Sequence, residues 1–136
     1  MGVGIRVGSI TDEIGTGDFL HAFFSTVSGR LERDWGERFP SLMTLYRGSL
    51  PADRAAAALT ELAEIRSELA AFPPDQLIWD IEDLTKLPPW GSDISPDITD
   101  LSNYFVTSAG RDLIDVMREA LEASRAEHRT AEIVAY

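Results

Sequence analysis

Cysteine is absent from this chain of 136 residues, histidine occurs only twice, and Lys86 is the one lysine. Without thiols there is no disulfide framework, no thiolate nucleophile and no cysteine-based zinc site. Two histidines offer few general bases, and the chain has no G-x-S-x-G elbow and no phosphate-binding glycine loop. These absences exclude several common enzyme classes.

Long apolar runs are also missing. No stretch approaches the roughly 18 to 20 residues of a membrane span, and the N-terminus lacks the basic flank and apolar core of a signal peptide. We therefore expect a cytoplasmic protein that does not enter a membrane. Basic residues are few as well, since twelve oppose twenty-three acidic residues for a net charge of −11. Such a chain lacks the basic stripe of a nucleic-acid binder, so no nucleic-acid ligand is expected.

The residues that are present indicate a folded domain. Hydrophobic residues make up 44% and charged residues 26%, and the length fits a single domain over residues 1–136. Periodicity predicts strands at 3–7, 77–82 and 102–108, and helices at 18–33, at 51–72 and after an N-cap at Ser108. Residues 11–18 are interpreted as a turn, 41–48 as a short helix or a strand, and 131–136 as an edge strand or a frayed end. This order predicts an α+β fold with about three amphipathic helices on a small sheet.

The negative charge is concentrated in one region. Residues 73–103 contain seven acidic residues and one basic residue, a net of −6, which is more than half of the excess. Asp80 and Glu82 would lie on one side of the predicted strand, roughly 6 to 7 Å apart, a spacing that could serve a glycosidase pair. A chain of this length leaves little room for the deep cleft of such an enzyme. A small carboxylate-dependent hydrolase is therefore an alternative rather than the main hypothesis.

Metal binding is a weaker interpretation. Asp93, Asp97 and Asp100 could supply oxygen ligands to a divalent cation, but their spacing does not fit an EF-hand loop, and Ser95 and Asp97 are equally good turn formers. Neither a metal nor another cofactor is expected. His21 lies opposite the apolar stripe of its predicted helix and is interpreted as a solvated side chain.

A binding surface fits the acidic region better. An aromatic anchor surrounded by carboxylates attracts a basic partner and gives it a desolvated centre of contact. The predicted contact residues are Asp80, Glu82, Asp83, Trp90, Asp93, Asp97 and Asp100. We call residues 77–100 the acidic segment.

The stretches "MGVGIRVGSITDEIGTGDFLHAFFSTVSGRLE", "WGERFPSLM", "LIWDIEDLTKLPPWG" and "ITDLSNYFVTSAGRDLIDVMREAL" resemble the immunity protein 70 family, cytoplasmic antidotes in bacterial polymorphic toxin systems. The resemblance runs to about Ala123, and nothing after His128 contributes to it. It implies a non-catalytic protein that binds a cognate toxin domain. Many toxin domains are nucleases with a basic substrate groove, which an acidic inhibitor can occupy. The resemblance assigns no residue a role.

A structural subunit of a bacterial assembly is a further alternative. The three classes differ in simple observations: the gene of a binder lies directly downstream of a toxin gene, a hydrolase gathers carboxylates in a concave pocket, and an assembly subunit forms large oligomers. The sequence is compatible with a monomer and with a homodimer.

Overall fold

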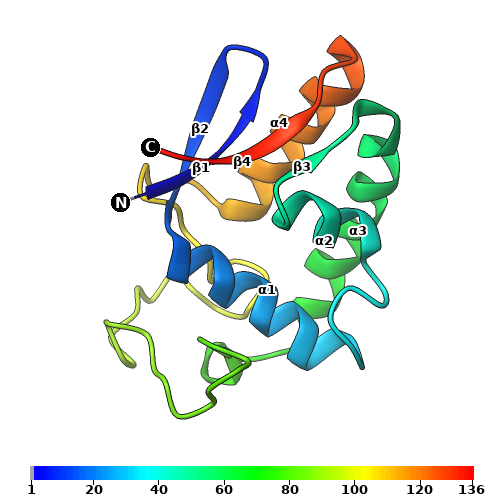
Figure 1. Ribbon diagram of the computed structural model, residues 1–136. Helices are drawn as coiled ribbons and strands as arrows, with labels where there is room; N and C mark the ends of the chain where they lie inside the picture. The colour runs from blue at the N-terminus through cyan, green and yellow to red at the C-terminus, as the bar shows by residue number, and fades with distance from the viewer. Residues whose placement is uncertain (1) are drawn as a thin grey trace.

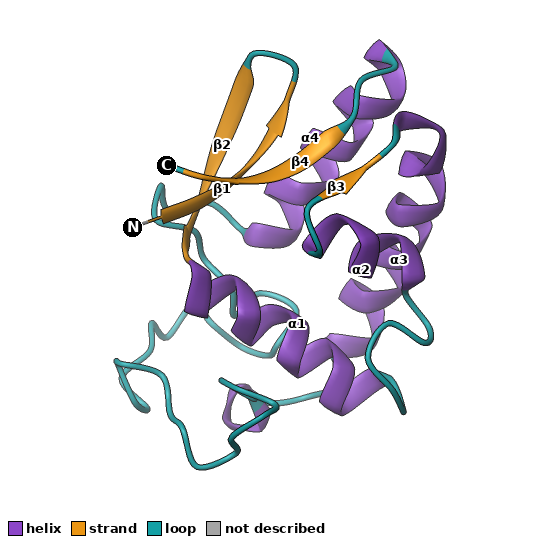
Figure 2. Ribbon diagram, viewed as in Figure 1, coloured by secondary structure: helices purple, strands orange, loops and turns teal. Residues whose placement is uncertain are grey.

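Four strands form one antiparallel sheet in the order β2-β1-β4-β3 (Figures 1 and 2). The computed structural model describes residues 2–136. The strands are β1 (Gly2–Val7), β2 (Ile10–Thr16), β3 (Ser49–Leu50) and β4 (Ala131–Ala135). The α-helices are α1 (Gly17–Leu31), α2 (Pro40–Tyr46), α3 (Ala55–Leu69) and α4 (Leu113–Glu127), and two 3-10 turns are η1 (Ala52–Arg54) and η2 (Pro74–Gln76). The predicted α+β class is confirmed.

The interpretation of residues 11–18 as a turn is wrong, because most of them form the edge strand β2. The turn lies before β2, where Gly8 has a φ of +62°. Ile14 is fully buried, whereas the other β2 residues are exposed or half-buried, and all of them except Ile10 are polar or glycine. An edge strand needs only one paired side and one covered face, so a largely polar sequence can form it.

The C-terminal strand β4 is central rather than frayed or at an edge. It pairs with β1 on one side and with β3 on the other, and Ala131 is fully buried opposite Val7 and Leu50. The pairing with β1 joins opposite ends of the chain, so local periodicity could not reveal it.

Three of the helices have 15 residues each and supply much of the core. Thr16 caps α1 by accepting a hydrogen bond from the Phe19 amide at 3.1 Å, and the buried face of α1 includes Phe23. The predicted N-cap at Ser108 is wrong, because Asp112 caps α4 by accepting from the Asp115 amide at 3.2 Å. Among residues 2–136, no helix is long and apolar enough to cross a membrane.

The strands predicted at 77–82 and 102–108 are wrong as well. Both stretches belong to an irregular connection between η2 and α4, in which Val106 and Asp112 form one isolated bridge. In Figure 1 the yellow-green part of this connection lies on the side of α1 away from the sheet. Its later residues enter the core, with Leu101, Tyr104 and Phe105 buried.

Candidate functional site

The acidic segment begins against α1, which holds it through side-chain hydroxyl groups. Thr26 Oγ1 donates to the Ile78 carbonyl at 3.1 Å and accepts from the Ile78 amide at 3.0 Å. Ser25 Oγ accepts from the Ile81 amide at 3.1 Å. Ser25 and Thr26 are both fully buried. The backbone bonds that residues 77–82 would have made in a sheet are thus replaced in part by bonds to a helix.

A glycine lets this backbone come close to the helix. Any Cβ at Gly29 would collide with the side chain of Ile78, and Ile81 would lie 3.7 Å from it. Gly29 has an ordinary helical backbone, so its role is to leave space rather than to adopt an unusual φ. The face of α1 that carries Ser25 and Gly29 is therefore a docking surface inside the protein.

Asp80 lies at the centre of the first acidic turn. Its Oδ1 accepts from the Glu82 amide at 2.9 Å and lies 3.2 Å from His21 Nε2, while Lys86 Nζ lies 3.4 Å from Oδ2. These donors, led by the Glu82 amide, lower the pKa of the Asp80 carboxyl. The Asp80 side chain is 16% exposed. Asp80 is thus a fixed, ionised carboxylate with partners from two elements.

The prediction that His21 is a solvated side chain is wrong. Its Nδ1 lies 2.9 Å from the Tyr46 hydroxyl and its Nε2 faces Asp80, so both ring nitrogens have protein partners. The imidazole also packs 5.8 Å from the Trp35 ring, measured between centroids. Burial, together with the nearby carboxylates Glu82 and Asp80, raises the pKa of Tyr46. His21 connects α1, α2 and the acidic segment.

The same cluster is where residues 2–136 come closest to a set of metal ligands. One ligand atom each from His21, Asp80 and Glu82 lie within 4.8 Å of one another. An imidazole with two carboxylates is a donor set suited to a transition metal such as zinc or manganese. The Lys86 ammonium group already contacts Asp80 and supplies a positive charge there.

Asp83 completes this turn. Its Oδ1 accepts from the Thr85 hydroxyl at 2.6 Å and from the Thr85 amide at 3.1 Å, and these bonds lower the pKa of the Asp83 carboxyl. The Asp83 amide donates to the Asp80 carbonyl at 3.1 Å. Glu82, between them, is exposed. Asp80, Glu82 and Asp83 are therefore brought together, although not by the strand that their spacing suggested.

Trp90, the predicted aromatic anchor, also has an internal role. Its indole packs edge to face on Trp79 with centroids 5.4 Å apart, and its Nε1 donates to the Tyr104 hydroxyl at 2.8 Å. Trp90 is 38% exposed. Trp90 and Asp93 line a hollow of about 310 Å³ together with Phe19, Ile94, Ser95, Ile98, Tyr104 and Val106.

Asp97 and Asp100 belong to a following turn. The Asp100 carboxylate accepts from the Ser102 amide at 2.8 Å and from its hydroxyl, which lowers the pKa of Asp100. Asn103 donates to the Asp97 carbonyl at 3.1 Å. The seven predicted contact residues thus form three local groups along the segment, around Asp80, Trp90 and Asp100.

Two exposed leucines in the acidic segment were missed by sequence reasoning. Leu84 is 73% exposed and Leu87 is 76% exposed, the largest values among the exposed large hydrophobic side chains. Turns in which the Asp83 amide donates to the Asp80 carbonyl and the Lys86 amide to the Asp83 carbonyl lead into them. The available signal was two leucines in a polar, proline-rich stretch outside any amphipathic periodicity.

Comparison with known protein families identifies the family of this chain. The model of a family described as Immunity protein 70 matches residues 5–133. The chain belongs to the immunity protein 70 family. The match extends beyond the resemblance that ended near Ala123 and includes most of β4. Comparisons with curated proteins and with solved structures gave no match.

Membership in the immunity protein 70 family makes this an immunity protein, whose role is to protect against a toxin. It does not select a surface, since the match covers nearly the whole chain. The acidic segment lies within residues 73–103, which carry more than half of the excess negative charge of the chain, and it is bonded to α1 through Ser25 and Thr26.

Proposed function

We propose that this protein neutralises a cognate toxin domain in the cytoplasm by binding it through the acidic segment, without catalysis of its own. One observation carries the proposal: the most acidic stretch of an immunity protein is fixed to α1 and exposes two leucines. An ordered surface loses less conformational entropy on binding than a mobile one. The ordered turns of the segment therefore favour affinity, and so does its negative charge.

The electrostatics favour a basic partner surface. Asp80, Asp83 and Asp100 each accept hydrogen bonds that lower the pKa of the carboxyl, so all three are ionised near neutral pH. A toxin with nuclease activity would offer a basic substrate groove, and the acidic segment would occupy or cover it. Complementary charge would steer the encounter, with association rates up to about 10⁸ M⁻¹s⁻¹ at low salt.

The apolar contacts favour Leu84 and Leu87 as anchors. Both side chains are largely exposed in the free protein, and the burial of a leucine contributes about 1.5 to 3 kcal/mol. Trp90 contributes the rim of a hollow that could receive one side chain of the toxin. We thus expect an interface with an apolar centre and carboxylates around it, which is the usual arrangement of binding hot spots.

A carboxylate-dependent hydrolase receives less support. Asp80 and Glu82 line neither of the two hollows described on residues 2–136, and Asp80 is engaged by His21 and Lys86. A glycosidase pair requires both carboxyl groups beside a substrate cleft.

The first experiment co-expresses this chain with the toxin domain encoded beside it and measures growth rescue, co-purification and the Kd. We expect rescue with a stoichiometric complex. Asp80→Ala with Glu82→Ala should weaken binding by roughly 2 to 5 kcal/mol, since a charge on the partner loses its counterpart. Glu13→Ala with Asp53→Ala is the matched control, because these exposed carboxylates make no ion pair among residues 2–136.

A second double variant, Leu84→Ser with Leu87→Ser, tests the apolar centre and should weaken binding without removing charge. Wild-type affinity in both double variants would show that the toxin binds elsewhere. Rescue without any complex would instead indicate enzymatic removal of the toxic product and would return attention to the carboxylates.

A further inference from the structure

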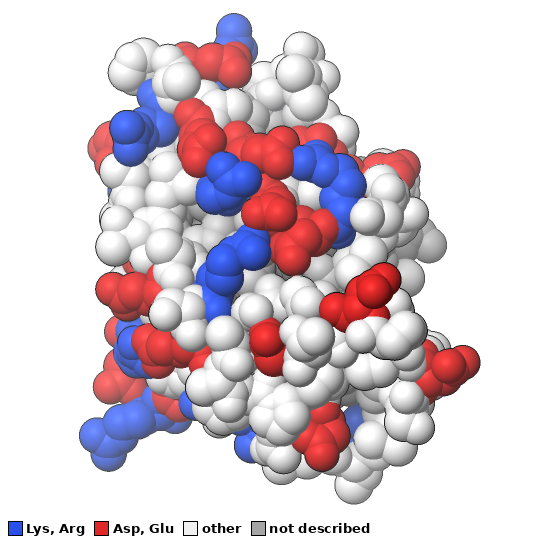
Figure 3. All heavy atoms as spheres, turned by 180° about the vertical axis from the view of Figure 1, so that it is seen from behind, with Lys and Arg blue, Asp and Glu red and all other residues white. Residues whose placement is uncertain are grey.

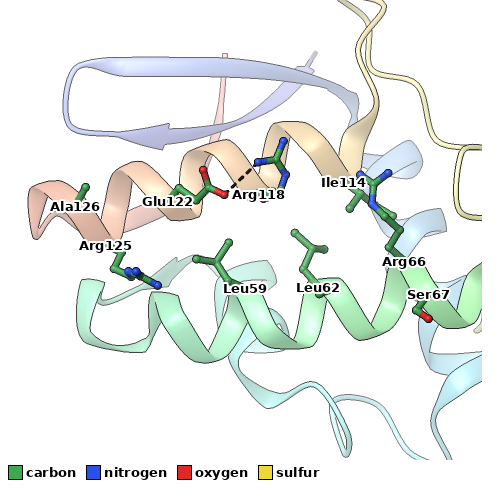
Figure 4. A pocket seen from close by; sticks show the side chains of 10 residues that line it. Leu59, Leu62, Arg66, Ser67, Ile114, Arg118, Glu122, Arg125 and Ala126 are labelled. Carbon is green, nitrogen blue, oxygen red and sulfur yellow. Dashed lines mark hydrogen bonds and ion pairs between the residues drawn. The ribbon is translucent and has the colours of Figure 1, made fainter.

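A second surface lies on α3 and α4, away from the residues assigned to the toxin. A groove of about 810 Å³ runs between these helices, and its lining includes no residue of the acidic segment (Figure 4). Its apolar part consists of Leu59, Leu62, Ala63, Ile114 and Ala126. The family match assigns no role to this groove.

The groove is elongated. On α4 the lining residues recur at 114, 118, 122 and 126, which is one face of the helix, and they extend over about 18 Å at 1.5 Å per residue. On α3 the lining extends from Leu59 to Ser67. Figure 4 shows Leu59 near the Arg125 end and Arg66 near the Ile114 end, so the helices run antiparallel. Such a strip fits a length of polypeptide better than a compact ligand.

Three arginines lie along the rim. Arg66 pairs with Asp115 at 2.7 Å, and Arg118 pairs with Glu122 at 3.1 Å. All four of these side chains are 40% exposed or more, so the pairs are weak and can exchange partners. Arg125 makes no ion pair among residues 2–136 and extends from α4 towards α3.

The charge of the surface around the groove bears on what these arginines can bind. On the face seen in Figure 3, acidic and basic side chains alternate in the upper part, whereas most charged side chains lower down are acidic. The groove lining contains three arginines and one glutamate, and Asp112 and Asp115 beside it also pair with Arg66 and Arg118. The positive charge of the lining that remains without an ion pair among residues 2–136 is Arg125, and the exposed pairs can exchange a carboxylate of this chain for one of a partner. The occupant that complements it is an acidic polypeptide segment with exposed apolar side chains.

This protein carries such a segment. Leu84 and Leu87 project from the acidic segment beside Glu82, which is exposed, and Asp83. We propose that the α3–α4 groove binds the acidic segment of a second copy of this chain, with the two leucines on the apolar floor and the carboxylates against the arginines. The contact joins two different surfaces, so it closes into a dimer where each copy both gives and receives a segment.

The proposed contact has a consequence for toxin binding, which rests on the proposed function. The acidic segment cannot occupy a toxin and the groove of a second copy at once. Toxin should therefore dissociate the self-associated form, and self-association should cover the exposed leucines while no toxin is present.

Sedimentation of the purified chain, without toxin, tests the proposal. We expect the average mass to rise above 15.0 kDa between about 1 μM and about 1 mM, the range in which a weak dimer forms. Ala63→Trp fills the groove and should raise the dissociation constant at least about tenfold, which is 1.4 kcal/mol. Ala57→Trp is the matched control, because Ala57 is an exposed alanine of α3 outside the groove.

Charge is tested in the same way. Arg125→Glu should weaken self-association, whereas Arg47→Glu should not, since Arg47 is also exposed at the end of a helix and lies outside the groove. Mixing Ala63→Trp protein with the Leu84→Ser, Leu87→Ser protein should give a mixed complex held by one of the two contacts, and neither variant should form this contact alone. The first copy keeps an intact segment and the second an intact groove.

A constant mass of 15.0 kDa at every concentration would overturn the proposal, as would unchanged association in both Ala63→Trp and Leu84→Ser, Leu87→Ser. Circular dichroism melting confirms that each variant is folded. The two proposals fail separately. Ala63→Trp should lose self-association but keep toxin rescue, whereas loss of the toxin complex in the wild type concerns only the proposed function.

Discussion

Asp80 and His21 depend on each other at the scale of single residues. Asp80 accepts from the Glu82 amide, faces His21 and contacts Lys86, and His21 in turn reaches Tyr46. An ionised carboxylate with three donors keeps its charge and its orientation, which is what a recognition residue requires. The neighbours of Asp80 therefore fix the charge and the orientation that its carboxylate would present at an interface.

The stability contributed by Asp80 should depend on pH in a defined direction. Because the pKa of its carboxyl is lowered in the folded protein, the contribution is complete above the unfolded value of about 3.9 and disappears as the pH falls through the lower folded value. Urea unfolding of wild type and Asp80→Asn should thus show a difference at pH 7 that shrinks between about pH 4 and pH 2. Asp53→Asn controls for the loss of one exposed negative charge. A difference independent of pH would show that the contacts of Asp80 do not stabilise its charged form.

At the scale of elements, the acidic segment is ordered without forming a strand or a helix. Its first residues are fixed by hydroxyl groups of α1, its centre by the packing of Trp90 on Trp79, and its end by the turn around Asp100. Each anchor is a side chain that satisfies backbone groups or buries an aromatic ring. The segment should consequently be released in parts when single anchors are removed.

Thr26→Val tests the first anchor. Valine has nearly the same shape but cannot bond the Ile78 amide and carbonyl, so we expect a loss of roughly 1 to 3 kcal/mol in the free energy of unfolding. Hydrogen exchange at residues 77–82 should also accelerate. Thr60→Val is the control, because the Thr60 hydroxyl bonds only the Ala56 carbonyl of its own helix. Equal stability in the two variants would mean that the docking of the segment on α1 does not depend on Thr26.

At the scale of the whole molecule, net charge and its distribution act in different ways. A charge of −11 opposes the approach of two copies at long range, while in the two proposed contacts the acidic segment and the α3–α4 groove would attract complementary surfaces at short range. Self-association should therefore be weak, and a basic toxin should compete with it successfully. This balance follows from the distribution of charge over the surface.

Association with a basic toxin should consequently be sensitive to salt. We expect the association rate, measured by stopped flow, to fall at least about tenfold between roughly 10 mM and 500 mM sodium chloride, because screening shortens the range of attraction. The slope should be smaller for Asp80→Ala with Glu82→Ala, and unchanged for Glu13→Ala with Asp53→Ala. A rate independent of salt in the wild type would exclude electrostatic steering of the encounter.

The parts that local sequence determined are those whose partners lie nearby along the chain. The three long helices were predicted because apolar residues repeat every three or four positions, and the α+β class and the acidic character of residues 77–100 followed from the order of elements and the composition. The resemblance to the family was likewise carried by contiguous stretches, and the family match confirmed it over residues 5–133.

The tertiary structure decided everything that required a distant partner. Residues 77–82 alternate like a strand, but their backbone groups are bonded by Ser25 and Thr26, so no sheet forms there. The ends of the chain meet as β1 and β4, and His21 is partly buried because the acidic segment docks beside it. Hydrogen bonds and burial depend on which surfaces meet in space, whereas periodicity records only which residues share a face.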